Sequence, residues 1–426
     1  MEIIVNPAPS QWEKMCERNA PSDDKVIESV KQIVANVRKN GDDALRHYAQ
    51  EFDHADIDAL ELTTSEREAL AAQVAPEVRQ AIDHACKNIT AFHQAQMPKP
   101  VEVETQSGVR CVQKAVPIQR VGLYIPGGRA PLFSTVLMLA APARIAGCKH
   151  VVLCTPQGAD GRIAPEIIYA ANACGVDHIY RVGGAQAIAA MAYGTESIPR
   201  VDKIFGPGNR FVTHAKQLVS TTTAIDMPAG PSEVLVMADQ TAHAAYVAAD
   251  MLSQAEHGPD SQAILVCHTE AFAHEVAAEV ERQTALLPRR ELVEHSLSHS
   301  RILVFPTREE MTAFSNAYAP EHLIISMDNP WDIAEHITAA GSVFIGNYSP
   351  ESAGDYASGT NHTLPTSGWA RSFSGVNIDS FMRKITYQEL TQEGLRSLSS
   401  TIVTMAEAEG LHAHAQAVNV RMNRAQ

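Results

Sequence analysis

The sequence has few cysteines, and none of them forms a Cys-x-x-Cys pair. Their number is odd and their spacing irregular, which excludes a disulfide framework and a cysteine zinc site. Thiols of this kind are typical of a reducing compartment such as the cytoplasm. The seven residues are Cys16, Cys86, Cys111, Cys148, Cys154, Cys174 and Cys267.

The chain also lacks a long apolar run and an export leader. Its longest apolar segment, residues 130–143, has 14 residues, contains two prolines and is flanked by Arg129 and Arg144. A membrane-spanning helix needs about 20 apolar residues, and the first residues show no basic stretch followed by an apolar one. We therefore expect a cytoplasmic protein without a membrane partner.

Positive charge is in deficit, because 34 Lys and Arg residues face 49 Asp and Glu residues, for a net charge of −15. Such a chain repels phosphate backbones, and we expect no nucleic-acid partner. The glycine fingerprints of standard dinucleotide- and phosphate-binding loops are absent as well. Any nucleotide must therefore be held by other turns.

What is present is an ordinary globular composition, 45% apolar and 19% charged over 426 residues, which is enough for two or more domains. From residue 112 onward, short β-branched runs alternate with turns and alanine-rich helical patterns, as in parallel α/β sheets. Residues before 98 and after 379 are predicted to be helical, with Ser65 and Glu68 as a capping box. The predicted strands form two groups: 120–124, 151–154, 178–182, 203–205 and 233–237, then 263–267, 302–305, 323–325 and 343–345.

Gln254 and His257 are three residues apart at the end of a predicted helix that Gly258 and Pro259 stop. Residues at this spacing share one helix face, so both can reach one metal ion or one substrate. The structural alternative is that His257 favours the negative end of the helix dipole while Gln254 is solvated.

Glu321 and His322 follow Pro320 at a predicted helix-to-strand junction, where sites of α/β proteins tend to gather. A carboxylate beside an imidazole offers two proton-transfer groups with different pKa values. Neighbours in a regular strand point to opposite faces, so both can serve one substrate only if the junction is irregular. A surface Glu-His pair is the alternative.

The segment 346–368 is crowded with small and polar residues and has no usable period. Loops of this length in compact enzymes are often functional, which makes Asp355 and His362 candidate metal or substrate ligands. Asp355 could instead bond its own turn. Further on, His412 and His414 are two apart on a predicted helix, so at most one faces a given site, and exposed histidines are the simpler interpretation.

Taken in order, several strings resemble histidinol dehydrogenase along nearly the whole chain. The resemblance implies two incomplete Rossmann-like α/β domains of parallel sheets with helical N- and C-terminal extensions. It implies oxidation of L-histidinol through L-histidinaldehyde to L-histidine, the last steps of histidine biosynthesis, with reduction of two NAD molecules. The strings are Val-Gly-Leu-Tyr124-Ile-Pro-Gly-Gly, Gly-Gly-Ala-Gln186-Ala-Ile-Ala-Ala, Phe-Gly-Pro-Gly-Asn209, Asp226-Met-Pro-Ala-Gly-Pro-Ser232-Glu-Val, Ser-Gln254-Ala-Glu-His257-Gly-Pro-Asp-Ser-Gln, Pro-Glu321-His322-Leu and Ser-Ala-Gly-Asp355-Tyr-Ala-Ser-Gly-Thr-Asn-His362.

The resemblance also implies roles for individual residues. Glu321 would activate water and His322 would act as base, while one zinc ion per subunit, replaceable by manganese or cobalt, positions the substrate. The implied zinc ligands are Gln254, His257, Asp355 and His414. The implied substrate contacts are Ser232, Gln254, His257, Glu321, His322, Asp355, His362, Glu409 and His414. The implied NAD contacts are Tyr124, Gln186 and Asn209. His412 rivals His414, which is preferred for its spacing from Glu409.

The family is a homodimer, so the tail is expected to contribute Glu409 and His414 to the partner's site. The expected parts are an N-terminal arm (1–22), a substrate and zinc domain (23–120 with 237–375), an NAD domain (121–236) and a helical tail (376–426). Without the resemblance, the same ligand types would fit a zinc hydrolase, and a noncatalytic binding protein with two α/β lobes is a third hypothesis. A related dehydrogenase of a sulfonated diol fits the strings around Asp226 and His257 less well.

Overall fold

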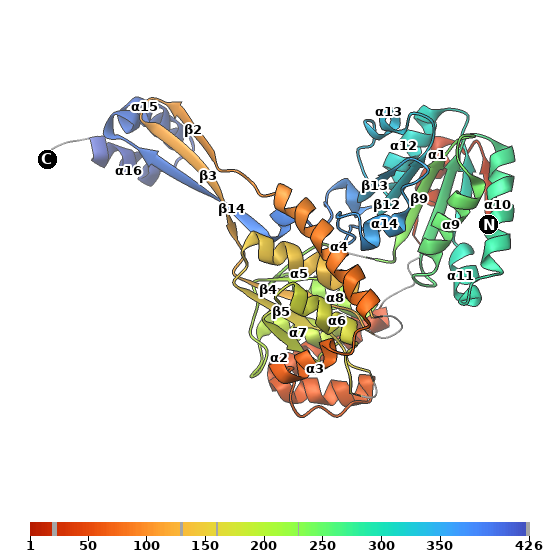
Figure 1. Cartoon of the computed structure of the whole chain (residues 1–426). Coiled ribbons are helices and arrows are strands. Elements are labelled where there is room, and N and C mark those ends of the chain that lie inside the picture. Colours follow the sequence, from red (N-terminus) through yellow and green to blue (C-terminus); the bar gives the residue numbers. More distant parts are fainter. Residues whose placement is uncertain (19–23, 128–130, 159–160, 229, 423–426) are drawn as a thin grey trace. The chain divides into compact units, whose positions relative to one another are not determined.

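The structure is a computed structural model that describes residues 1–18, 24–127, 131–158, 161–228 and 230–422 (Figure 1). The chain forms two compact units. One comprises Met1–Gln96 with Ile118–Phe381, and the other comprises Met97–Pro117 with Met382–Gln426. Among the described residues, no helix combines the length and the apolarity needed to cross a bilayer.

The first unit contains a six-stranded, all-parallel sheet in the order β1-β11-β10-β9-β12-β13. The side chains of β9, β10 and β12 are all buried, as expected for a parallel sheet covered on both faces. The strands are β1 (Glu2–Val5), β9 (Glu233–Ala238), β10 (Gln262–Cys267), β11 (Arg301–Val304), β12 (His322–Ser326) and β13 (Ser342–Ile345).

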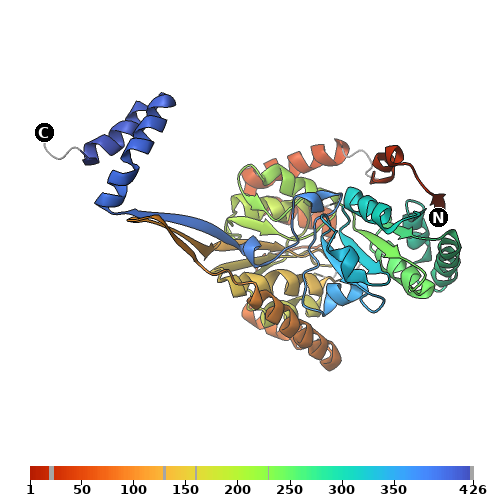
Figure 2. The ribbon, with the colours of Figure 1, turned by 90° about the horizontal axis from the view of Figure 1, so that it is seen from above.

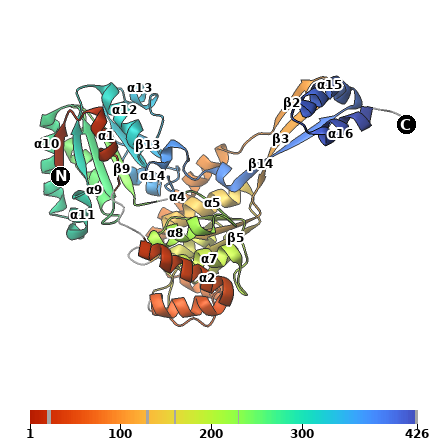
Figure 3. The same cartoon turned by 180° about the vertical axis from the view of Figure 1, so that it is seen from behind.

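Alternate residues of these strands enter two separate cores. Val234 and Val236 pack against one set of helices, α9 (Ala244–Ala255), α10 (Glu270–Thr284) and α11 (Arg290–Leu297). Leu235 and Met237 face the other set, α1 (Pro9–Met15), α12 (Arg308–Tyr318) and α13 (Pro330–Ala334). Figures 1 and 3 show the two helical layers from opposite sides.

The same unit contains a five-stranded parallel sheet in the order β6-β5-β4-β7-β8. Helices cover both of its faces, which Figure 2 shows edge-on. One face packs against α2 (Asp24–Tyr48), α7 (Gly184–Tyr193) and α8 (Arg210–Val219). On the other side α5 (Phe133–Ala146) packs with α4 (Pro76–Ala95) and α6 (Pro165–Ala173). The strands are β4 (Arg120–Tyr124), β5 (His150–Cys154), β6 (His178–Tyr180), β7 (Lys203–Phe205) and β8 (Ala224–Ile225).

The remaining elements of this unit are short. The segment after α2 is a π-helix, Ala49–Asp53, followed by α3 (Thr64–Ala71). After β13 come α14 (Glu351–Tyr356) and two single turns, Trp369–Arg371 and Ile378–Phe381. The predicted loop 346–368 therefore contains one short helix, α14.

Helices α2, α3 and α4 pack with the five-stranded sheet, where Val30 and Leu45 of α2 share a core with Ile188 of α7. This differs from the predicted boundary, which joined residues 23–120 to 237–375. An apolar stripe shows that one face of a helix is buried, but it does not identify the sheet that covers this face. The sequence alone therefore could not assign these helices to one of the two sheets. Residues 1–18 of the predicted arm pack on the six-stranded sheet, where β1 pairs with β11, and residues 19–22 lie outside the described residues.

The second unit is an antiparallel sheet, β14-β3-β2, with two helices, α15 (Gln392–Ala408) and α16 (His412–Met422). Its strands are β2 (Val101–Gln106), β3 (Val109–Pro117) and β14 (Met382–Leu390). The prediction of helix throughout this tail is wrong for β14. All of β2 and most of β14 are exposed, so these strands lack the apolar alternation that marks a half-buried strand.

The predicted capping box at Ser65 and Glu68 is also wrong by two residues. Thr63 and Glu66 form it instead: the Glu66 main-chain N–H donates to Thr63 Oγ1 at 3.2 Å, and the Thr63 N–H donates to Glu66 Oε2 at 2.8 Å. The Ser/Thr-x-x-Glu spacing occurs twice within six residues, and the pair at the helix start forms the box.

Candidate active site

Glu321 and His322 meet at an irregular junction between α12 and β12. The helix ends at Tyr318, and Ala319 takes a left-handed conformation (φ 53°, ψ 66°) before Pro320. His322 is the first residue of β12. The two side chains are buried, and Glu321 Oε2 lies 3.7 Å from His322 Nδ1. The junction thus meets the geometric requirement for a shared substrate.

This junction lies at the amino edge of the six-stranded sheet, next to Ser232, which precedes β9. Helix α9 connects the carboxyl end of β9 with β10, so its last turn, with Gln254, returns to the same edge. Ligands of open α/β sheets usually bind at the carboxyl edge. The candidate site therefore lies at the end of these strands opposite to the one that this rule predicts.

Three metal-ligand side chains gather at this edge. His257, Glu351 and Asp355 each offer a ligand atom, and these atoms lie within 4.8 Å of one another. Glu351 and Asp355 are four apart on α14 and so point to one side of it. His257 follows the last residues of α9, and its side chain is 48% exposed. The geometry brings together two of the residues identified from the sequence.

Gln254 joins the cluster through Glu351. With its amide oriented so that Nε2 faces the carboxylate, Gln254 donates to the two Glu351 oxygens at 2.9 and 3.3 Å. In this orientation the Gln254 Oε1 atom does not face the Glu351 carboxylate. Glu351 is the site residue that the sequence prediction missed. The Glu351-x-x-x-Asp355 spacing was the available signal, and the loop-like composition around it concealed α14.

His322 lies among three carboxylates. Its Nδ1 is 3.8 Å from Glu351 Oε1, and its Nε2 is 3.7 Å from Asp355 Oδ1. Nδ1 also donates to the main-chain oxygen of Glu233 at 3.3 Å. Among the residues that the structure describes, the buried Nε2 has no hydrogen-bond partner. In the neutral ring, the proton is therefore on Nδ1 and the lone pair is on Nε2.

The carboxylates give the site a surplus of negative charge. Burial by itself lowers the pKa of His322, but Glu351, Glu321 and Asp355 together outweigh it and raise the pKa to about 10. Burial raises the pKa of Glu321 to about 8 and that of Glu351 to about 7. Burial opposes ionisation of Asp355 too, yet His322 holds the pKa of that carboxyl below its usual value. Such a cluster favours cations.

His362 and Ser232 complete the part of the site in the first unit. His362 Nδ1 donates to the main-chain oxygen of Asp355 at 2.9 Å, and its Nε2 lies 3.2 Å from Thr135 Oγ1. Ser232 is half-buried beside β9.

Glu409 and His414 belong to the second unit. Glu409 directly follows α15 and His414 lies in α16, and both are exposed, as is His412. A role for them in the site stays a prediction.

The residues expected to contact NAD lie along the carboxyl edge of the five-stranded sheet. Tyr124 ends β4, Asn209 follows β7, and Gln186 lies in the first turn of α7. The strand order reverses between β4 and β7, which is where such sheets bind nucleotides. The Tyr124 hydroxyl accepts from the Gly184 N–H at 3.1 Å, and Asn209 Oδ1 caps α8 by accepting from the Val212 N–H at 3.2 Å.

Comparison with known proteins then decides the family. The sequence model of histidinol dehydrogenase matches residues 16–422. The chain belongs to the histidinol dehydrogenase family. The resemblance drawn from the sequence is confirmed, and so is the α/β fold class. Histidinol dehydrogenase is by its name an oxidoreductase of histidine biosynthesis, and that enzyme class holds for this chain.

Individual relatives cover almost the full chain. The histidinol dehydrogenase of Bacteroides thetaiotaomicron is 52% identical over 99% of both chains. That of Salmonella typhimurium is 54% identical over 98% of this chain and 96% of its own. The crystal structure of histidinol dehydrogenase from Elizabethkingia anophelis superposes with a TM-score of 0.97 at 49% identity, covering 99% of this chain and 98% of that one.

The charge arrangement gives a prediction for the metal-free protein. Glu351→Gln should lower the pKa of His322, because the charge of Glu351 is the largest single influence that raises it. The folded pKa lies above the usual 6.5, so the charged ring stabilises the fold at low pH, and this stabilisation is lost as the pH rises from about 6.5 to about 10. The variant should lose less stability over that range.

An NMR titration of the histidine rings in the presence of a chelator measures the shift. Glu256→Gln is the control, since Glu256 raises the pKa of His257 and is not among the main influences on the pKa of His322. An unchanged His322 midpoint in Glu351→Gln would contradict the charge arrangement.

Proposed function

We propose that the protein catalyses the NAD-dependent, two-step oxidation of L-histidinol through L-histidinaldehyde to L-histidine, with one zinc ion per subunit. The observation that carries the proposal is the buried Glu321–His322 pair beside a cluster of metal-ligand side chains. A base, a water-activating carboxylate and a cation site are the groups that such an oxidation requires.

The described residues fit a zinc ion. Imidazole, carboxylate and amide oxygen are ligands that zinc accepts, and the proposed holders are Gln254, His257 and Asp355, with His414. Glu351 binds the amide nitrogen of Gln254, which leaves the amide oxygen to act as the ligand. When bound, zinc would hold the imidazole and amino nitrogens of histidinol and so present its alcohol to His322.

His322 is the proposed base of both oxidations. In the neutral ring Nδ1–H donates to Glu233, which leaves the Nε2 lone pair to take the hydroxyl proton. A cation bound beside the carboxylates that raise the pKa of His322 would favour this neutral form. NAD would supply the hydride acceptor for each oxidation. Tyr124, Gln186 and Asn209 are the proposed NAD contacts, and their place at the strand-order reversal supports this assignment.

Glu321 is the proposed water-activating residue. The aldehyde must gain a water molecule before its second oxidation, and a carboxylate can take the proton that this water releases. Burial raises the pKa of Glu321, which makes its carboxylate a stronger base. Ser232, His362 and Glu409 are proposed to hold the substrate alongside these groups.

Assembly and compartment belong to the same proposal. We infer a homodimer in which the tail carries Glu409 and His414 into the partner's site. The proposed compartment is the cytoplasm, because scattered free thiols are typical of a reducing environment.

An assay with zinc, L-histidinol and NAD tests the function, and it should yield two NADH per L-histidine. His322→Asn should slow both oxidations by about 10²–10⁴-fold, the usual contribution of a positioned acid or base. Glu321→Gln should mainly impair aldehyde oxidation, because the first step uses no water.

The same assay separates the alternatives. Hydrolysis without NAD reduction would favour a zinc hydrolase, and binding without turnover would favour a binding protein. Equal loss of both half-reactions in Glu321→Gln would remove its proposed role.

Metal analysis tests the ligand assignment. His257→Asn should lower the zinc affinity by more than about tenfold, since even groups that only orient a ligand contribute about 10–100-fold. The matched control is His274→Asn, an exposed histidine on α10. Unchanged zinc content after dialysis of His257→Asn would refute this ligand.

Mixing two inactive variants tests the shared site. His414→Asn and His322→Asn should recover about a quarter of the wild-type activity when their subunits exchange, because half of the dimers are hybrids with one intact site. Hybrid dimers without activity would show that the tail serves its own subunit.

A further inference from the structure

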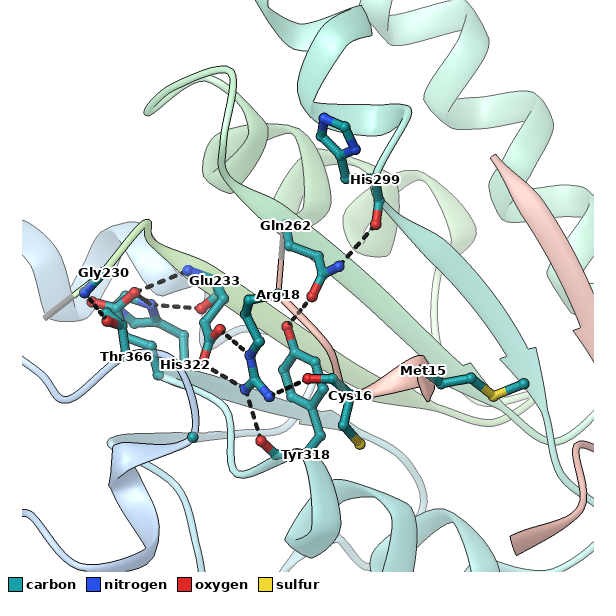
Figure 4. Close-up of polar contacts among 12 residues, drawn as sticks. Met15, Cys16, Arg18, Gly230, Glu233, Gln262, His299, Tyr318, His322 and Thr366 are labelled. Carbon is teal, nitrogen blue, oxygen red and sulfur yellow. Dashed lines mark hydrogen bonds and ion pairs between the residues drawn. The ribbon is translucent and has the colours of Figure 1, made fainter. Parts of the chain in front are cut away.

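A buried ion pair lies behind the catalytic junction. Arg18 binds Glu233 with a two-pronged contact: Nε donates to Oε2 at 2.7 Å, and Nη2 donates to Oε1 at 2.9 Å. The side chain of Glu233 is 1% exposed and that of Arg18 is 13% exposed. Figure 4 shows the pair between the N-terminal segment and β9.

Glu233 also contacts both proposed catalytic residues, through its main chain. Its N–H donates to Glu321 Oε2 at 3.0 Å, and its carbonyl oxygen accepts from His322 Nδ1 at 3.3 Å. These two bonds fix the Glu321 carboxylate and the tautomer of His322. A shift of this one residue would misplace both groups.

Arg18 holds the other side of the junction as well. Its Nη2 donates to the main-chain oxygen of Tyr318 at 2.7 Å, and its guanidinium carbon lies 3.7 Å from the centre of the Tyr318 ring. Tyr318 is the last residue of α12, and its hydroxyl donates to Gln262 Oε1 of β10 at 2.6 Å. The guanidinium thus joins the start of β9 to the helix end that precedes Glu321.

The N-terminal segment that carries Arg18 is itself anchored. Nη1 of Arg18 donates to the main-chain oxygen of Cys16 at 2.7 Å. Earlier in the segment, Trp12 makes edge contacts with Phe305 and Phe314, at ring-centre distances of 5.7 and 5.6 Å. Arg18 therefore acts from a fixed position, and its planar fork matches the carboxylate in a way that lysine cannot.

We propose that Arg18 is a positioning residue for Glu321 and His322, acting through the main chain of Glu233. The inference rests on the proposed function. It gives the N-terminal segment a part in the reaction although none of its residues is among the proposed substrate contacts.

The test compares two arginine–carboxylate pairs, one near the start of β9 and one just after its end. Arg18 joins the start of β9 to the end of α12, whereas Arg308, the first residue of α12, pairs with Asp239 just after β9 at 3.1 Å. Arg308→Met is therefore the matched control. Activity is expressed per folded, zinc-loaded chain, so that lost folding does not count as lost catalysis.

Arg18→Met should lower kcat of both half-reactions by about 10–100-fold, because a misplacement of about 1 Å costs about 10²-fold. KM for histidinol should change less than kcat, and zinc content should change little, since neither Arg18 nor Glu233 is a proposed ligand. Arg308→Met should keep its kcat. A normal kcat in Arg18→Met would overturn the inference.

A double variant separates positioning from stability. Replacing both members of a buried ion pair by apolar residues is often neutral for stability, so Arg18→Met with Glu233→Met should unfold near the wild-type temperature and still show the low kcat. Recovery of kcat along with stability would mean that the pair only stabilises the fold, which would overturn the inference.

A crystal structure of Arg18→Met gives an answer that does not depend on activity. The distance from Glu233 N to Glu321 Oε2 should grow from 3.0 Å beyond hydrogen-bond range. An unchanged distance would refute the positioning role. Wild-type protein that fails to oxidise histidinol would instead refute the proposed function and leave this geometric result to decide the inference.

Discussion

Three carboxylates share a buried space with one imidazole, and much of the local structure compensates for that charge. Glu321, Glu351 and Asp355 each lie within 3.8 Å of a ring nitrogen of His322. Burying an unpaired charge costs several kcal/mol. The Glu233 N–H and the Gln254 amide each bind one of these carboxylates, which lowers that cost. A cation bound at the cluster would lower it further, so metal binding and folding of this edge are expected to be linked.

The position of the site follows from which segments can supply these groups. Strands β9 and β12 are buried on both faces and offer no room for ligands along their length. Their amino ends are different, because α12 and α9 both end there and the left-handed Ala319 breaks the chain out of regular geometry. The ends of α12 and α9 and the short connections thus place Glu321, His322 and Gln254 close together. The paired strands hold this edge of the sheet rigidly.

The sequence could predict what depends on local pattern. The β-branched runs became strands β4 to β7 and β9 to β13, and the need for an irregular turn at Pro320 agrees with the structure. It could not place α2 and α4 on the correct sheet, because an amphipathic stripe does not identify the sheet against which the helix packs. It missed β14 because that strand is mostly exposed. Glu351 was not predicted as a site residue, because its place in the site depends on contacts with His257 and Gln254, which are about a hundred residues away in the sequence.

The segment after α14 connects the two sheets that the proposed reaction would use. Asn361 Nδ2 donates to the main-chain oxygen of Met138 at 2.6 Å, and His362 accepts from Thr135, so both residues bind α5. Helix α5 follows β4, whose carboxyl end carries the proposed NAD contact Tyr124. Four residues later, Thr366 accepts a hydrogen bond from the N–H of Gly230, just before Ser232 and β9. Hydride transfer requires the nicotinamide and the substrate carbon to be held within a few ångströms. These short polar contacts connect the two sets of residues that are proposed to hold the reactants, which is a physical reason for so long a polar segment to be ordered.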